Sequence, residues 1–164
     1  MKRLYMIGGT MGIGKTTVSQ YLKTELNNSV FLDGDWCWDM HPFHVTEETK
    51  EMVMRNICTL LNNFIKCSAI ENIIFCWVMD KQDIINDILS RLIMVECRGI
   101  VISLVCSEDE LKKRLKRDIN SGVRNADILQ RSIERLPLYK ELDTIKIDVS
   151  KKTIKEIKDV IVSI

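Results

Sequence analysis

Hydrophobic residues gather in five short runs, separated by longer segments in which they recur every three or four positions. The runs fall at residues 3–7, 30–32, 73–79, 100–105 and 145–149. Such continuous apolar character is typical of strands that are buried on both faces, whereas the intervening period is that of amphipathic helices. Alternation of strand and helix without hairpin turns predicts an α/β fold in three layers, a five-stranded parallel sheet with helices on both faces.

Several helices can be placed from their own sequence. Residues 15–27 and 47–66 are expected helices, and Thr46 occupies the N-cap position of the second, with Thr49 rather than glutamate three residues later. Leucines and isoleucines recur at helical spacing in two further segments, around Leu111 and after residue 153, and both segments are expected to bury one face. We assign no chemistry to the last helix.

Composition narrows the class of protein. A chain of 164 residues with 46% hydrophobic and 29% charged residues fits one globular domain, residues 1–164, and a net charge of +1 provides no overall field for nucleic acid or membranes. No apolar stretch is long enough to span a membrane. The six cysteines are scattered without metal-like spacing and are expected to be reduced core residues, which indicates a cytoplasmic protein.

A glycine-rich motif follows the first predicted strand. Residues 9–16 read Gly-Thr-Met-Gly-Ile-Gly-Lys-Thr and match G-x-x-x-x-G-K-[ST] at every fixed position, directly before a predicted helix. Glycines let backbone N–H groups curl around phosphate oxygens, and the helix adds its positive dipole end. The residues expected to form this cradle are Gly9, Met11, Gly12, Ile13 and Gly14.

The end of the motif carries the side chains that nucleotide chemistry needs. Lys15 is expected to place its ammonium beside the β- and γ-phosphates, Thr16 to offer its hydroxyl to Mg²⁺, and Thr17 to donate to a further phosphate oxygen. The alternative, a chance match in a glycine-bearing turn, is disfavoured by the strand and helix around it. The sequence lacks the N-K-x-D motif that recognises guanine in GTPases and the LSGGQ-like signature of transporter ATPases. Small kinases are therefore the favoured class.

Two carboxylates follow the second predicted strand. Asp33 and Asp35 flank Gly34 at the edge of the sheet where ligands of parallel α/β folds bind. Alternate residues of an extended segment project to the same side, so we expect Asp33 to hold Mg²⁺ and Asp35 to accept the proton of an acceptor hydroxyl. Both aspartates are then substrate-binding as well. The alternative is a polar turn that ends a strand.

Aromatic side chains gather near these carboxylates. Trp36, Trp38 and Phe43 follow Asp35 at once, and Trp77 ends the third predicted strand. We expect Trp36 and Trp77 to line an acceptor pocket, while the alternative is that the tryptophans pack the core.

Three further polar residues stand in the same part of the sequence. Asp80 follows the third strand, where it either belongs to the magnesium site or caps the next helix. His41 and His44 lack partners at metal-ligand spacing and indicate a polar loop.

Positive charge is concentrated in residues 112–135, with eight Lys or Arg against three Asp or Glu. Arg114 and Arg117 share one expected helix face and are predicted to clamp nucleotide phosphates. Arg124 is predicted to reach the migrating phosphoryl group from a short lid of about residues 118–130. The lysines fit a solvated helix face, and without interleaved aromatic residues a nucleic-acid surface is disfavoured.

The loop at residues 9–17, the Asp33-Gly34-Asp35 step, the arginine-bearing segment and the strand pattern together resemble the P-loop nucleoside/nucleotide kinase-like group. This group includes shikimate, gluconate and adenylylsulfate kinases, and the resemblance spans nearly the whole chain. It implies the strand order 2-3-1-4-5, ATP with Mg²⁺ as donor, and a lid over the nucleotide. It also implies that the loop at residues 148–151 helps to hold adenine.

The sequence departs from this group at the acceptor side. The glycine triplet of shikimate kinases is replaced by Cys-Trp-Val-Met at residues 76–79, which argues against shikimate. The basic residue that adenylylsulfate kinases place after the aspartate pair is replaced by residues 36–38, Trp-Cys-Trp, which favours a less anionic acceptor.

The sequence therefore predicts an ATP-dependent small-molecule kinase with Lys15, Asp35, Arg117 and Arg124 as its catalytic residues. Its acceptor would be a hydroxyl or phosphate of a nucleoside, nucleotide, sugar, sugar acid or antibiotic. Two alternatives stay open. One is a nucleotide-dependent ATPase or binding module whose lid responds to a protein partner, and the other is a nucleic-acid 5′-hydroxyl kinase.

Overall fold

The computed structural model describes every residue from Met1 to Ile164 and contains one five-stranded sheet. The strands are β1 (Lys2–Gly8), β2 (Ser29–Asp33), β3 (Asn72–Cys76), β4 (Cys97–Val105) and β5 (Ile145–Asp148). All neighbouring strands are parallel, and their order is β2-β3-β1-β4-β5. The predicted fold class and strand order are confirmed.

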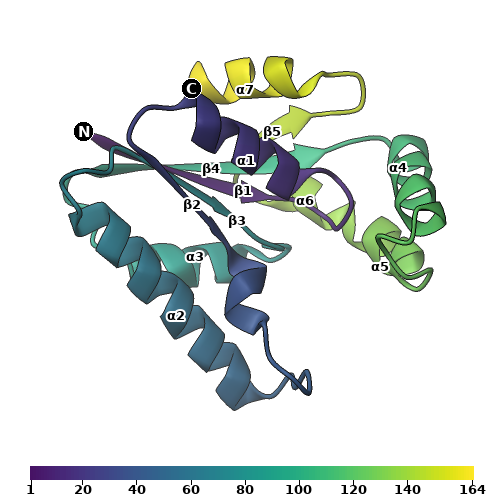
Figure 1. Cartoon of the computed structure of the whole chain (residues 1–164), viewed down its shortest axis with the longest axis horizontal. Coiled ribbons are helices and arrows are strands. Elements are labelled where there is room, and N and C mark those ends of the chain that lie inside the picture. The colour runs from purple at the N-terminus through teal and green to yellow at the C-terminus, as the bar shows by residue number, and fades with distance from the viewer.

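Helices cover both faces of the sheet and its carboxyl edge. They are α1 (Lys15–Glu25), the 3-10 helix η1 (Gly34–Trp38), α2 (Glu47–Lys66), α3 (Gln82–Ser90), α4 (Glu108–Asn120), α5 (Ile128–Arg135), α6 (Leu138–Glu141) and α7 (Ile154–Val162). Figure 1 shows α1 and α7 on one face and α2 and α3 on the other, while α4 and α5 stand beyond the end to which the β4 arrow points. No helix combines the length and apolar character that crossing a membrane would need.

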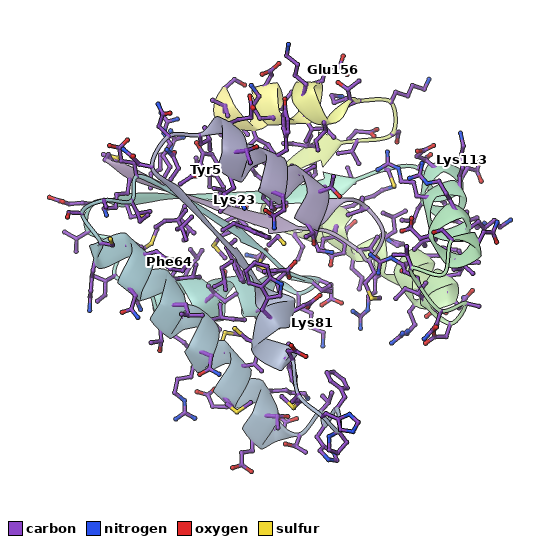
Figure 2. The ribbon with its side chains drawn as sticks, in the orientation of Figure 1. Tyr5, Lys23, Phe64, Lys81, Lys113 and Glu156 are labelled. Carbon is purple, nitrogen blue, oxygen red and sulfur yellow. The ribbon has the colours of Figure 1, made fainter.

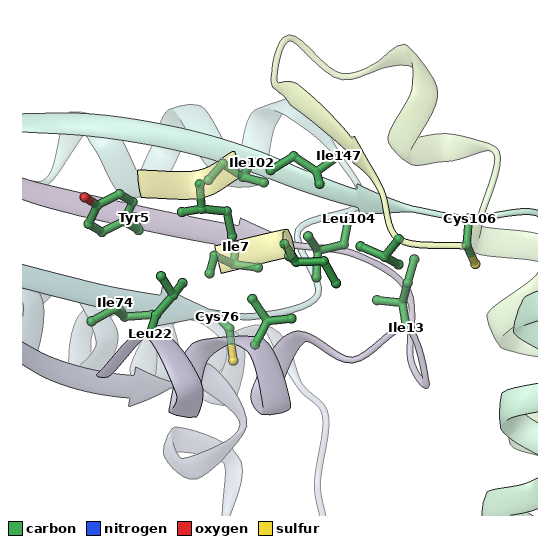
Figure 3. Packing of buried hydrophobic residues seen from close by; sticks show 14 of the residues in the cluster. Tyr5, Ile7, Ile13, Leu22, Ile74, Cys76, Ile102, Leu104, Cys106 and Ile147 are labelled. Carbon is green, nitrogen blue, oxygen red and sulfur yellow. The ribbon is translucent and has the colours of Figure 1, made fainter. Parts of the chain in front are cut away.

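The central strand is buried on both faces, as its unbroken apolar run predicts. Tyr5 and Ile7 of β1 belong to a cluster that includes Leu22 of α1 and Ile157 of α7. Figure 3 shows this packing from close by, with Ile13 of the glycine-rich loop at one end of the same cluster. The core on this face therefore anchors the loop that follows β1.

The opposite face packs against α2 and α3. Leu4 and Met6 of β1 belong to a second cluster with Ile57 and Leu61 of α2 and Ile88 of α3. Figure 2 shows the side chains of both layers on the ribbon. Alternate residues of one strand thus hold helices on both sides, which is the physical reason for its continuous hydrophobicity.

The second predicted helix has its expected start. The side-chain oxygen of Thr46 accepts a hydrogen bond from the N–H of Thr49 at 3.1 Å, and the hydroxyl oxygen of Thr49 accepts one from the N–H of Thr46 at 2.8 Å. Thr49 therefore fills the role that glutamate usually has in a capping box.

Several predicted boundaries were wrong. β3 ends at Cys76, three residues earlier than predicted, so Trp77 lies in the loop after the strand, and β4 begins at Cys97 rather than at residue 100. Two cysteines are not core residues, because Cys67 is exposed and Cys37 is only half-buried, although all six thiols are unpaired as predicted.

Candidate active site

The glycine-rich loop delivers free backbone N–H groups at the start of α1. Gly12 and Gly14 have φ angles of 81° and 105°, in the left-handed region that favours glycine. Gly14 is the N-cap of α1, no side chain caps this helix end, and its first turn holds no acidic residue. The N–H groups of the first turn are therefore available to an anion.

Packing against neighbouring side chains also holds the glycine-rich loop in place. A Cβ atom on Gly12 would lie 2.4 Å from Cδ2 of Leu115 on α4, so only glycine permits this approach of loop and helix. A Cβ on Gly9 would lie 2.8 Å from Cγ2 of Ile13, which places Gly9 at the packed base of the loop rather than in the space above it.

Lys15 lies at the bottom of the site, where its Nζ donates a hydrogen bond of 3.1 Å to the carbonyl oxygen of Thr10. Burial lowers the pKa of Lys15, and the nearby Cys76, Asp35 and Asp33 act in the opposite direction by favouring its charged form. The ammonium is thus desolvated, a condition in which it interacts strongly with an added anion.

The two motifs meet at Thr16 and Asp33. The hydroxyl of Thr16 donates a hydrogen bond of 2.9 Å to Oδ2 of Asp33, which is 7% exposed. No cluster of three or more His, Cys, Asp and Glu side chains forms a closed metal site in the structure. The hard oxygens of Thr16 and Asp33 fit Mg²⁺, which commonly takes one or two protein ligands and completes its shell with phosphate and water.

The geometry of the carboxylate pair differs from the prediction. Asp33 ends β2, but Asp35 lies in η1 rather than in an extended segment, because Oδ1 of Asp33 accepts the N–H of Asp35 at 3.1 Å and caps this helix. The expectation that alternation along a strand aligns both side chains was therefore wrong.

Asp35 nevertheless lies close to the glycine-rich loop. Burial raises the pKa of Asp35, the charge of Asp33 raises it further, and Lys15, the Trp77 indole and Arg124 oppose this shift. A carboxylate in these surroundings is a candidate acid or base.

A pocket of about 310 Å³ opens in front of the loop, and we call it the phosphate pocket. It is lined by the predicted residues Gly12, Ile13, Gly14, Lys15, Thr16, Thr17, Arg114, Arg117 and Arg124, and by Lys152 before α7 and Ile154 at its start. The structure thus brings together nearly all of the residues predicted for the nucleotide.

The arginines have different surroundings. Arg114 is held from three sides, because its Nε contacts Glu110 at 2.8 Å and its terminal nitrogens donate to the carbonyl oxygens of Ile13 at 3.1 Å and Val149 at 2.8 Å. These bonds make Arg114 a tie between the glycine-rich loop and the segment after β5, and its direct contact with phosphate stays a prediction. Arg124 contacts only Asp118, at 3.3 Å, and Arg117 is exposed.

A second pocket of about 770 Å³ adjoins Asp35, and we call it the aromatic pocket. All three tryptophans of the chain line it, together with Phe43 and Met11. The alternative of tryptophans packed only in the core is therefore wrong. Met11 also lines this second pocket, and its place in the phosphate cradle stays a prediction.

Sequence reasoning missed part of the aromatic pocket. Its lining includes Asp39, which directly follows Trp38, and Lys50 and Arg135, which come from distant segments and carry no motif. Asp80 also lines it and forms an ion pair with Arg135 at 3.5 Å. Asp80 does not cap α3, whose N-cap residue is Lys81.

His41 and His44 lie in an exposed loop, as predicted.

Comparisons with known proteins bear on the family and the fold of this chain. The family model described as "AAA domain" matches residues 6–137. A shikimate kinase from Buchnera aphidicola subsp. Schizaphis graminum is 26% identical over 174 residues, which cover 95% of this chain and 92% of that protein. A gluconokinase structure from Sinorhizobium meliloti 1021 has a TM-score of 0.67 at 18% identity, covering 94% of this chain and 86% of that one. The Deinococcus radiodurans tunicamycin resistance protein has a TM-score of 0.73 at 16% identity, covering 99% and 95%.

The solved structures are too distant in sequence to establish more than the fold. The shikimate kinase relative and the family match cover most of the chain, and they confirm the predicted kinase-like family and phosphotransferase class.

Proposed function

This chain belongs to the AAA domain family and is a small-molecule kinase, and from that premise we propose that it transfers the γ-phosphoryl group of ATP to a hydroxyl in the aromatic pocket. The observation that carries this proposal is the position of Asp35. It lines the aromatic pocket, while its pKa is influenced by Lys15 and Arg124, which line the phosphate pocket. Donor and acceptor sites thus share one carboxylate at their boundary.

The donor side is served by the glycine-rich loop. The uncapped N–H groups at the start of α1 would hold the β- and γ-phosphates, and Lys15 would neutralise the charge between them. Thr16 and Asp33 would hold Mg²⁺, which would supply positive charge to neutralise the phosphates during transfer. Lys152 and Ile154, which line the same pocket, lie just beyond the segment predicted to hold adenine.

The acceptor side is served by Asp35. A hydroxyl within hydrogen-bonding distance of this carboxylate is oriented toward the γ-phosphorus atom and can pass its proton to Asp35 as the new P–O bond forms. The raised pKa of Asp35 strengthens it as a proton acceptor.

The predicted lid, about residues 118–130, would bring positive charge to the phosphoryl group during transfer. Arg124 and Arg117 line the phosphate pocket from the α4 side, with Arg124 held by Asp118 alone. We propose that Arg124 leaves Asp118 to contact the migrating phosphoryl group when nucleotide is bound, in a site from which the lid excludes water.

The free thiols of all six cysteines suit a reducing compartment, so we infer a cytoplasmic location.

Transfer of labelled γ-phosphate across nucleosides, nucleotides, sugars, sugar acids and aminoglycosides tests this function. We expect label in an organic acceptor with the wild-type protein and with Asp83→Asn, an exposed control on α3, and its loss with Asp35→Asn. Label released only as inorganic phosphate would indicate the alternative ATPase or binding module. Label found only in RNA or DNA ends would indicate the 5′-hydroxyl kinase instead.

A further inference from the structure

The charge and the rings of the aromatic pocket restrict what it can accept. We infer that the acceptor is an uncharged or positively charged hydroxyl compound with a flat ring face, and that carboxylate- or phosphate-bearing acceptors are rejected. This inference rests on the proposed function of the same site, but it concerns binding and can be tested without turnover.

Acidic side chains outnumber basic ones in the pocket. Asp35, Asp39 and Asp80 line it on the acidic side, and Lys50 and Arg135 on the basic side. Glu47 pairs with Lys50, so four carboxylates accompany two cations here, and the excess negative charge, which persists even when Asp35 is protonated, repels an anion and attracts a cation.

Both basic residues are already paired with carboxylates. Arg135 contacts Oδ2 of Asp80 at 3.5 Å, and the Asp80 side chain is only 13% exposed. Lys50 contacts Oε1 of Glu47 at 2.7 Å, outside the pocket lining. An anionic acceptor would therefore compete with Asp80 and Glu47 for these cations, whereas no ion pair occupies Asp35 or Asp39.

The rings are braced by neighbouring side chains. Trp36 packs edge-on against the core residue Phe31, with ring centroids 5.3 Å apart and an angle of 71° between the planes. Trp38 packs against Phe43 with centroids 5.8 Å apart. Such packing fixes the ring planes before a ligand arrives, which reduces the entropy lost on binding.

Trp77 owes its position to a glycine. A Cβ atom on Gly34 would lie 2.5 Å from Cγ of Trp77, so the indole can lie over η1 only because residue 34 has no side chain. Gly34 thus has two roles: it forms the turn between Asp33 and Asp35, and it leaves room for the Trp77 indole that lines the pocket.

Large apolar surfaces stay exposed at the rim. Trp36 is 56% exposed and Phe43 is 64% exposed, and both line the aromatic pocket. A ligand ring packed against them would bury part of this apolar surface while its hydroxyl meets Asp35. The volume of about 770 Å³ lies within the usual range for small-molecule sites.

The three tryptophans offer a direct probe, because all of them line this pocket. The first measurement is quenching of their fluorescence by caesium, iodide and acrylamide at constant ionic strength, each normalised to N-acetyltryptophanamide. We expect caesium to quench more efficiently than iodide after this correction. Equal quenching, or stronger quenching by iodide, would overturn the inferred charge of the pocket.

The second measurement is binding of matched ligands, followed by tryptophan fluorescence with ADP and Mg²⁺ present to fill the donor side. The sets are uridine with uridine 5′-phosphate, and glucosamine and glucose with glucuronate, which keeps the sugar ring and adds a carboxylate. We expect at least about tenfold tighter binding of the members without an anionic group, a difference of about 1.4 kcal/mol. Tighter or equal binding of the anionic members would contradict the inference while leaving the kinase proposal intact.

Two variants test whether the ion pair between Arg135 and Asp80, rather than the total charge of the protein, causes the rejection of anions. Asp80→Asn frees Arg135, so iodide quenching should rise and the discrimination against anionic ligands should fall to about threefold or less. Asp127→Asn also frees an arginine of α5, Arg131, whose partner lies 2.9 Å away on the exposed side and outside the pocket. This control should behave like the wild type, and a similar change in both variants would contradict the assignment.

Discussion

Oγ1 of Thr16 and Oδ2 of Asp33 lie 2.9 Å apart and join the first turn of α1 to the end of β2. These residues are 17 positions apart in the sequence and come from the two separate motifs. Their oxygens converge beside Lys15, whose pKa is influenced by Asp33. The donor half of the proposed mechanism depends on this convergence, because these two oxygens are the ones that would hold Mg²⁺.

Replacement of Asp33 by asparagine should weaken magnesium binding. The amide can still accept the N–H of Asp35 and cap η1, so the fold should persist, but one ligand loses its charge. We expect the Mg²⁺ concentration that gives half-maximal transfer to rise by about 10- to 100-fold. Asp35→Asn provides the comparison, since it should lower the rate at all Mg²⁺ concentrations and leave this midpoint nearly unchanged.

Replacement of Lys15 by alanine should abolish most activity without unfolding the protein. The loss of one preorganised cation typically lowers a rate by about 100- to 1,000-fold. Because burial lowers the pKa of Lys15, its removal relieves a desolvation cost, and urea denaturation should show no loss of stability. Lys23→Ala, in the last turn of the same helix, should keep full activity, and equal losses in both variants would contradict the role of Lys15.

The rate should depend on pH through Asp35. Transfer needs its ionised form, so kcat/KM should rise with pH through a pKa that lies above the ordinary aspartate value of about 3.9. Asp35→Asn should remove this acidic limb and lower kcat by about 10²- to 10⁴-fold. A limb that persists unchanged in the variant would assign the titration to another group.

The same raised pKa has an opposite consequence for stability. The folded state holds the proton of Asp35 more tightly than the unfolded chain does, so its contribution disfavours folding as pH rises through the interval between the two pKa values. We therefore expect the free energy of unfolding of Asp35→Asn at neutral pH to equal or exceed that of the wild type. A clear loss of stability would show that Asp35 has a structural role.

The fold and the donor site could be predicted because their signals are local. The apolar run at residues 3–7 and the motif at residues 9–16 are contiguous, and each has one physical interpretation. The turn at Asp33 was misread, although an aspartate two residues before a free N–H is a known capping arrangement.

The acceptor side was only partly predictable. Trp36 and Trp77 stood out because tryptophan is rare in this chain, and both line the pocket. Lys50 and Arg135 come from α2 and α5, and only the packing of the sheet brings them to one pocket. The pairing of Arg135 with Asp80 joins residues 55 positions apart, which no local pattern encodes.

Contact between the glycine-rich loop and α4 should be sensitive to one methyl group. Gly12→Ala places a Cβ 2.4 Å from Leu115 at a positive φ, and we expect a loss of about 1–3 kcal/mol in the free energy of unfolding by urea. Gly14→Ala also has a positive φ but meets no atom within 4 Å, so its loss should be smaller. The reverse order would contradict the described packing.

Arg114 should act on nucleotide affinity more than on the chemical step. Lysine cannot make the bonds to Ile13, Val149 and Glu110 at once, so Arg114→Lys should loosen the segment after β5. We expect the KM for ATP to rise on the order of tenfold, with kcat changed much less.

Lys113→Ala serves as the control for Arg114, because Lys113 lies on the outer side of α4 (Figure 2). This variant should keep the wild-type KM for ATP. A rise in KM equal to that of Arg114→Lys would assign the effect to the charge of α4 rather than to the tie.

The fate of the γ-phosphoryl group tests the central claim most directly. The wild type and Asp35→Asn are each supplied with γ-labelled ATP, Mg²⁺ and a mixture of nucleosides, sugars and amino sugars. The label in organic acceptors and the label in inorganic phosphate are then measured separately. The proposed mechanism predicts label mainly in an acceptor hydroxyl for the wild type and its loss in the variant. Label only in inorganic phosphate, in equal amounts for both proteins, would contradict it.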